Sequence, residues 1–191
     1  MCAKKIALCV LVASIVATAA VAGPFGLEMG MSLEEVQQVC GGRAPEHISD
    51  IRYQIEPVKK HPSFSTYIAW IDPTVGLCFI RANSEEIDSN STGDQIKNEF
   101  YKVEAALSKS YGKGRLTNEL SRDCVFTDES YWFYTLRSGE RKLEAQWFPK
   151  KSDICWIDLF ATSVSFKGAI ISLQYEFTNY EKAREEQDSV L

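Results

Sequence analysis

The segment from Asp88 to Glu99, DSNSTGDQIKNE, has the residue spacing of a calcium-binding loop. Its potential ligands stand at loop positions 1, 3, 5 and 12, and a glycine stands at position 6: Asp88, Asn90, Thr92, Glu99 and Gly93. In such loops oxygen ligands alternate, glycine permits the sharp bend, and the last glutamate binds calcium with both carboxylate oxygens. The segment is therefore a candidate metal site.

Other features of the same segment favour a simple turn. Position 8, which is apolar in calcium loops, is Gln95, and the preceding residues 79–87 have the pattern of a strand rather than a helix. Asn, Ser, Thr and Gly also form ordinary turns and helix caps. We favour a turn that caps the next helix, and we expect neither a metal nor a cofactor.

Residues suited to nucleophilic or acid–base catalysis are few. The two histidines, His47 and His61, stand in loop-like segments near prolines, and the chain has no G-x-S-x-G or H-E-x-x-H motif. Adjacent carboxylates such as Glu85 and Glu86 point in divergent directions on a strand or helix. We predict no catalytic residue; a cell-envelope hydrolase in which His47, Asp50 or paired carboxylates converge is the alternative.

The first 22 residues have the layout of a secretory signal peptide. Lys4 and Lys5 precede an apolar run from Ile6 to Val16, and small residues stand at Ala20 and Ala22. The run is shorter than the roughly 20 residues that a membrane-spanning helix needs. We expect cleavage after Ala22, no membrane span thereafter, and a periplasmic or secreted protein.

The six cysteines divide at this predicted cleavage site, because Cys2 and Cys9 precede it. The other four would enter an oxidising compartment and are predicted to form two disulfides, with buried free thiols as the alternative: Cys40, Cys78, Cys124 and Cys155. Three pairings are open. Cys40 with Cys78 and Cys124 with Cys155 is weakly favoured, because each pair would lie within one half of the chain.

The charge of the chain argues against two classes of partner. The formal net charge is −5 at pH 7, and no stripe of Lys and Arg is present. Nucleic acids and anionic membrane surfaces attract basic surfaces. We therefore expect a protein or envelope component as the partner, and no nucleic acid.

The first half of the chain predicts one helix and three strands. In residues 30–42, Ser32 and Glu35 form a capping-box pattern, and Gly41 and Gly42 end the helix. The strand segments, separated by proline-containing turns, are 51–58, 64–72 and 75–83.

The second half predicts one longer helix and four strands. Ile96, Phe100, Val103, Leu107 and Tyr111 recur at helical spacing. The strand segments are 130–137 and 141–148, which would form a hairpin, followed by 153–161 and 169–177.

This order of elements predicts an α+β fold, with helices packed on one face of an antiparallel sheet or sheets. Four parts follow: a signal peptide at 1–22, a helix-plus-meander unit at 23–93, a second helix-plus-sheet unit at 94–178, and a C-terminal tail at 179–191. The two units could stand in tandem or join into one compact domain.

The run from Gly26 to Pro45, GLEMGMSLEEVQQVCGGRAP, resembles the first helix of small envelope-assembly lipoproteins of the SmpA/BamE type. The two-unit order is similar to the secreted β-lactamase-inhibitor proteins, which are tandem repeats of that module. The opening is also similar to exported bacterial proteins that begin GLxxGMSxEEV. Unlike the lipoproteins, this chain has no lipobox cysteine, and its first unit has one helix rather than two.

Strand alternation predicts a binding face in the second half. If residues 130–137 form a strand with Trp132, Tyr134 and Leu136 in the core, the opposite face carries aromatic residues and an arginine: Tyr131, Phe133, Arg137 and, from the next strand but one, Trp156. Protein-binding hot spots have this composition. We predict an exported, non-catalytic binding or accessory module; the alternative is that the tail or the other half covers these residues as ordinary core.

Overall fold

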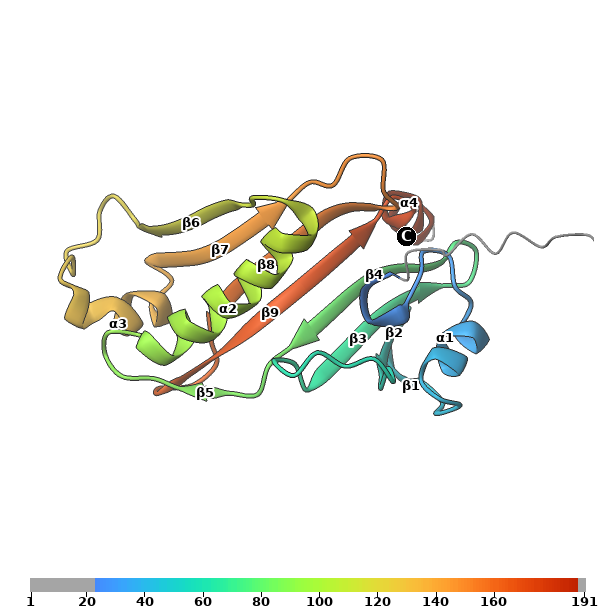
Figure 1. The fold of residues 1–191 in the computed structure, drawn as a ribbon, viewed down its shortest axis with the longest axis horizontal. Helices are drawn as coiled ribbons and strands as arrows, with labels where there is room; N and C mark the ends of the chain where they lie inside the picture. Colours follow the sequence, from blue (N-terminus) through green and yellow to red (C-terminus); the bar gives the residue numbers. More distant parts are fainter. Residues whose placement is uncertain (1–22, 189–191) are drawn as a thin grey trace, which may run out of the picture.

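Nine strands form one antiparallel sheet in the computed structural model, which describes residues 23–188. The strand order is β1-β2-β3-β4-β9-β8-β7-β6, and the short β5 also pairs with β9 (Figure 1). The strands are β1 (Glu46–Ser49), β2 (Arg52–Ile55), β3 (Thr66–Asp72), β4 (Gly76–Asn83), β5 (Ile87–Asp88), β6 (Arg115–Leu120), β7 (Arg141–Trp147), β8 (Ile154–Ser163) and β9 (Gly168–Phe177). The predicted α+β fold is confirmed; the predicted signal peptide lies outside the described residues.

Four α-helices and two 3-10 turns accompany the sheet in the described part of the chain. They are η1 (Pro24–Gly26), α1 (Leu33–Val39), α2 (Asp94–Tyr111), η2 (Glu129–Tyr131), α3 (Trp132–Arg137) and α4 (Tyr180–Asp188). No helix among residues 23–188 is long and apolar enough to cross a membrane.

The two halves of the chain repeat one order of elements. Helix α1 precedes the meander β1–β4, and helix α2 precedes the meander of β6, β7, β8 and β9. The last strands of the two meanders pair antiparallel, with Arg81 on β4 opposite Gln174 on β9. Both predicted units therefore contribute to one continuous sheet.

The helix boundaries follow the capping and periodicity signals. Ser32 Oγ accepts a hydrogen bond from the Glu35 backbone N–H at 3.3 Å, and Glu35 Oε2 accepts from the Ser32 N–H at 2.8 Å, which completes the capping box. Helix α2 buries Ile96, Phe100, Val103 and Leu107 and ends at Gly112, whose φ is 82°. Glycine adopts this conformation without steric cost.

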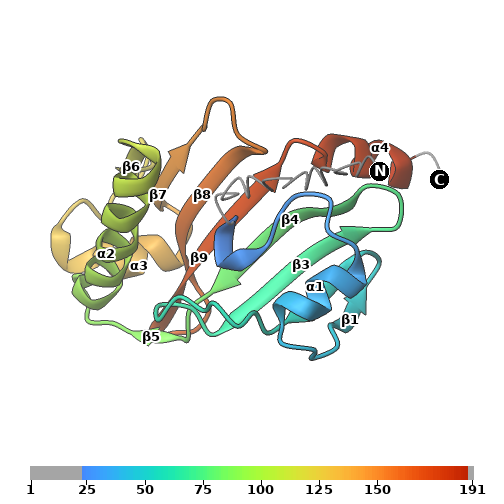
Figure 2. The same ribbon diagram turned by 45° about the vertical axis from the view of Figure 1, so that its right-hand side comes forward.

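The two faces of the sheet have different surroundings (Figure 2). The face that we call the core face carries residues such as Ile80, Leu173 and Tyr175, and α1 and α2 lie on this side. The opposite face, which we call the outer face, carries Arg81 and Gln174 at its centre. Helix α4 lies against one end of the outer face, where the rings of Tyr180 and Phe79 are 5.2 Å apart.

Residues 130–137 were predicted as a strand, and this prediction is wrong. They form η2 and α3, because Asp128 Oδ1 accepts from the Ser130 N–H at 2.8 Å and starts a helical turn. Trp132 then packs fully buried against Gly93, where φ is 72° and an added Cβ would lie only 1.8 Å from the ring. The strand that pairs with β7 at this edge is β6, not residues 130–137, and the sequence pattern did not predict β6.

The first meander has four strands rather than three. Residues 46–55 form β1 and β2, joined by a turn at Asp50, whose φ is 48°. The short turn brings Ser49 opposite Arg52.

The predicted disulfides are not present among the described residues, where Cys40, Cys78, Cys124 and Cys155 are free thiols. Three of the thiols donate hydrogen bonds to backbone carbonyl oxygens: Cys78 Sγ to Trp70 O, Cys124 Sγ to Phe126 O, and Cys155 Sγ to Glu176 O. Burial raises the pKa of Cys78 to about 12, so this thiol is protonated at neutral pH.

Candidate functional site

The structure brings together two of the four residues predicted to form a binding face. Tyr131 and Arg137 both flank Tyr134 at the α3 end of the molecule. Phe133 is buried, because the segment is helical and strand alternation does not apply. Trp156 lies on β8 opposite Glu176, towards the other end of the sheet.

Aromatic side chains gather around Arg137 on the surface. The ring of Phe126 lies 5.1 Å from Tyr131 and 4.9 Å from Tyr134, measured between centroids. The Arg137 guanidinium lies 4.0 Å from the centroid of Phe166, in the β8–β9 turn, and 5.5 Å from that of Tyr134. We call these five residues the aromatic patch: Phe126, Tyr131, Tyr134, Arg137 and Phe166.

The aromatic patch is exposed to a degree unusual for large apolar side chains. Phe166 is 77% exposed, Tyr131 45% and Tyr134 39%, and the neighbouring Val125 is 80% exposed. The rings of Phe166 and Tyr134 contact the Arg137 guanidinium, and this cation–π attraction orders them without burying them. Exposed aromatic residues grouped around an arginine are characteristic of protein-binding hot spots.

A pocket of about 530 Å³ adjoins the aromatic patch on the outer face of the sheet. Arg137 belongs to both features. The other lining residues that bear on its chemistry are Arg141, Lys142, Glu144, Asp158, Phe160 and Gln174. We call it the Asp158 pocket.

Asp158 is the group in this pocket with an unsatisfied hydrogen-bonding capacity. Its side chain is 5% exposed, and its Oδ1 atom has no hydrogen-bond partner among residues 23–188. Burial, and secondly the nearby charge of Glu144, raises the pKa of Asp158 to about 7. A carboxyl group with this pKa gains and loses its proton in the physiological range.

The neighbours of Asp158 form a polar row across the centre of the sheet. Gln146 on β7 and Gln174 on β9 stand directly opposite Asp158 on its two sides. With its amide oxygen turned towards Arg81, Gln174 accepts from Arg81 Nη2 at 2.6 Å and from Nε at 2.8 Å. Because β-strand residues in register share a face, these side chains all belong to the outer face.

Glu144 forms an ion pair with Lys142. Its Oε2 atom lies 2.7 Å from Lys142 Nζ, and the Glu144 side chain is almost completely buried. The Lys142–Glu144 ion pair leaves Asp158 as the carboxyl group of the pocket that no side-chain cation contacts in the described part of the chain.

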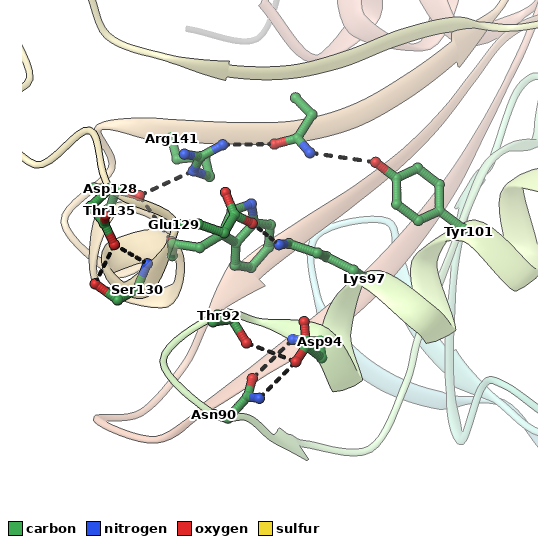
Figure 3. A network of polar contacts seen from close by, with 12 residues as sticks. Asn90, Thr92, Asp94, Lys97, Tyr101, Asp128, Glu129, Ser130, Thr135 and Arg141 are labelled. Atoms are coloured by element: carbon green, nitrogen blue, oxygen red, sulfur yellow. Dashed lines mark hydrogen bonds and ion pairs between the residues drawn. The ribbon is translucent and has the colours of Figure 1, made fainter.

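The candidate calcium loop serves as a helix cap in this structure (Figure 3). Asp94 Oδ2 accepts from Asn90 Nδ2 at 2.8 Å and from Thr92 Oγ1 at 2.7 Å, and Asn90 Oδ1 accepts from the Asp94 N–H. These hydrogen bonds from Asn90 and Thr92 lower the pKa of Asp94. Asp94 Oδ2, Asn90 Oδ1 and Thr92 Oγ1 are therefore occupied by hydrogen bonds within the loop.

The other expected ligands of the loop lie apart from this cap. Glu99, at loop position 12, accepts from Lys102 Nζ at 3.2 Å, and Asp88 pairs with Gly168 in the sheet. Residues 23–188 contain no group of three or more His, Cys, Asp or Glu side chains placed to hold a metal.

A second polar network fixes α3 to the rest of the second half (Figure 3). Lys97 on α2 forms an ion pair with Glu129 and lies 4.7 Å from the Trp132 ring centroid. Arg141 on β7 donates to Thr135 Oγ1 at 3.1 Å and to Asn118 Oδ1 at 3.0 Å. The network holds in place the helix that carries Tyr134 and Arg137.

The two histidines belong to separate segments. His47 Nε2 lies 2.8 Å from the Asp50 carbonyl oxygen in the β1–β2 turn. His61, between β2 and β3, has its Nδ1 atom 3.2 Å from the Ser63 N–H, and burial lowers its pKa. Neither residue lines the Asp158 pocket.

No protein family, curated protein or solved structure matches this chain. The resemblance to SmpA/BamE-type and β-lactamase-inhibitor modules therefore stays a prediction.

Sequence reasoning did not single out Asp158 or Glu144, because alternation placed both on a solvated face. In the structure that face is partly closed, and Glu144, Asp158, Ser172 and Gln174 are all buried. The available signal was one carboxylate within the apolar run ICWIDLF. An unpaired charge there requires a partner or a raised pKa.

Proposed function

We propose that this chain is an exported, non-catalytic binding module that docks on a protein through the aromatic patch. The observation that carries the proposal is the exposed group of aromatic rings ordered around Arg137. Such rings contribute contact area at low cost in conformational entropy, and arginine supplies directional hydrogen bonds at the rim.

The position of the patch supports this proposal. Its residues come from the segment before η2, from η2 and α3 themselves, and from the β8–β9 turn, and the Lys97–Glu129 and Arg141–Thr135 contacts hold α3 in place. A surface on a fixed support loses little entropy on binding. Export, which we expect from the N-terminal sequence, would bring the aromatic patch into the same compartment as envelope or extracellular proteins.

Alanine variants test this proposal through partner capture. We expect Phe166→Ala and Tyr131→Ala to reduce capture of a specific protein from envelope extract at least tenfold. The melting temperature should change by less than about 2 °C, because exposed side chains contribute little to stability. Phe148→Ala is the matched control, since Phe148 is 62% exposed and follows β7 at its other end. Equal capture by all four proteins would refute docking through the patch.

One observation favours the alternative of a cell-envelope hydrolase. Two carboxyl groups, Glu144 and Asp158, line one pocket, and a pKa of about 7 suits Asp158 to general acid–base catalysis. A panel of nitrophenyl glycosides and esters at pH 5 to 8 tests this alternative. Turnover that Asp158→Asn abolishes would establish an enzyme, and no turnover by the parent protein on any substrate would count against one.

A further inference from the structure

We propose that the Asp158 pocket binds a primary ammonium group, with Asp158 Oδ1 accepting a hydrogen bond from the ligand nitrogen. The two sources of this chemistry are a lysine side chain and a free alkylamine. For the lysine source the inference rests on the proposed function, because Arg137 joins the pocket to the aromatic patch.

Asp158 is the carboxyl group of the pocket that forms no ion pair with a neighbouring cation in the described part of the chain. Lys142 is paired with Glu144 at 2.7 Å, and the Arg137 guanidinium stacks on Phe166. Arg81 donates to the Gln174 amide oxygen, and Arg141 donates to Thr135 Oγ1 and Asn118 Oδ1. Each cation near Asp158 thus has another partner, and Oδ1 has none within residues 23–188. A buried acceptor without a donor is unfavourable, and a ligand N–H would satisfy it.

The walls of the pocket select the type of cation. Leu136 and Ala161 are apolar lining residues, and Phe160 adds an aromatic ring. These walls suit the methylene stem of an alkylamine. A single open acceptor oxygen matches a compact ammonium better than the planar fork of a guanidinium, which prefers two parallel bonds.

A metal cation fits the pocket less well. Calcium requires six to eight oxygen ligands. Two carboxyl groups line this pocket, and Glu144 is already paired with Lys142. Residues 23–188 supply no third His, Cys, Asp or Glu to such a cluster.

Binding of an ammonium should depend on pH. The charged and titratable groups around Asp158 are Glu144, Lys142 and Arg141 from β7, Arg137 from α3 and Arg81 from β4 through Gln174. Since the pKa of Asp158 is about 7 without ligand, the ammonium must select the ionised form. The affinity should therefore rise about tenfold from pH 6 to pH 8.

Titration of the purified protein with Nα-acetyl-lysine methylamide tests the inference. We expect saturable shifts of the Asp158 carboxyl carbon signal in NMR spectra, and a fall in the pKa of Asp158 of at least one unit at saturation. The uncharged analogue Nα-acetyl-norleucine methylamide should cause neither change. Asp158→Asn should weaken binding at least tenfold, whereas the exposed Asp123→Asn should leave it unchanged. Equal responses to the charged and uncharged analogues, or no response, would overturn the inference.

A parallel titration with n-butylamine separates the two sources. Binding of n-butylamine as tight as that of the lysine derivative would identify a free amine ligand, and much weaker binding would identify a lysine side chain. Tyr131→Ala changes the aromatic patch but leaves Arg137 stacked on Phe166, and Tyr131 does not line the pocket, so this variant should bind both probes normally. If neither probe binds while Phe166→Ala still loses its protein partner, the pocket inference fails and the proposed function stands.

Discussion

The two halves of the molecule share an order of elements but differ in how their outer strands are connected. In the first half, a short turn at Asp50 joins β1 to β2. In the second half, residues 121–140 join β6 to β7 and contain η2 and α3. Four of the five residues of the aromatic patch come from this longer connection. The segment that distinguishes the second half from the first therefore carries most of the proposed protein-binding surface.

The central strands show a second difference. Ile68, Arg81, Gln174 and Asp158 form one row across β3, β4, β9 and β8. Arg81 and Gln174 occupy equivalent positions at the junction of the two meanders, and Ile68 and Asp158 occupy the next equivalent pair. In the first half this outer position is apolar, whereas in the second half it is a buried carboxyl group. The residues that line the Asp158 pocket all belong to the second half of this shared strand order.

Of the substitutions that we propose, the removal of the Trp132 ring should lower the free energy of unfolding most. Trp132→Ala deletes a fully buried ring that packs against Gly93 and lies beside Lys97 and Arg141. We expect a loss of about 3 to 5 kcal/mol in the free energy of unfolding, measured by urea denaturation. Trp70→Ala, at a half-buried position of the first half, should cost clearly less. Equal losses would mean that α3 does not depend on this ring.

The buried carboxyl group should make stability depend on pH. Below about pH 4, Asp158 is protonated in both the folded and the unfolded state. As pH rises, the unfolded state ionises first, and the folded state retains its proton until about pH 7. The free energy of unfolding therefore falls between pH 4 and 7.

Asp158→Asn should remove this penalty. We expect the variant to exceed the parent by roughly 3 kcal/mol at pH 8 and to match it near pH 4, measured by thermal denaturation at each pH. Asp123→Asn serves as the control for a loss of charge on the surface. A variant that is less stable than the parent at pH 8 would show that the ionised carboxylate has a stabilising partner.

The smallest effect is expected in the first half, at the cap of α1. Ser32→Ala removes the side-chain acceptor of the capping box and should cost about 1 kcal/mol in urea denaturation. Ser32→Asp retains an acceptor and should restore most of the loss. Because α1 is remote from the patch, protein capture should stay intact.

Much of the fold could be predicted because its elements carry local signals. The capping box of α1, the apolar spacing of α2 and the strand segments of β7 and β9 each depend on nearby residues, and the structure confirms them. The edge strand β6 has little alternation because both of its faces are largely exposed, so it gave no pattern.

The candidate site could be predicted only in part. Residues 130–137 contain many aromatic residues, which favours a strand by composition, but the Asp128 cap and the burial of Trp132 determine a helix. Tyr131 and Arg137 were found because their residue types suit binding. Phe126, Tyr134 and Phe166 join them through tertiary contacts between segments distant in sequence, which no local pattern reveals.

Site-specific photocrosslinking tests the central claim most directly. A photoreactive phenylalanine analogue would replace Phe166 in the aromatic patch or Val58, which is 71% exposed in the first half, and the cells would be irradiated with the protein in its natural compartment. The account predicts a discrete crosslinked protein adduct from position 166 and none from position 58. An adduct from position 58 alone would contradict it.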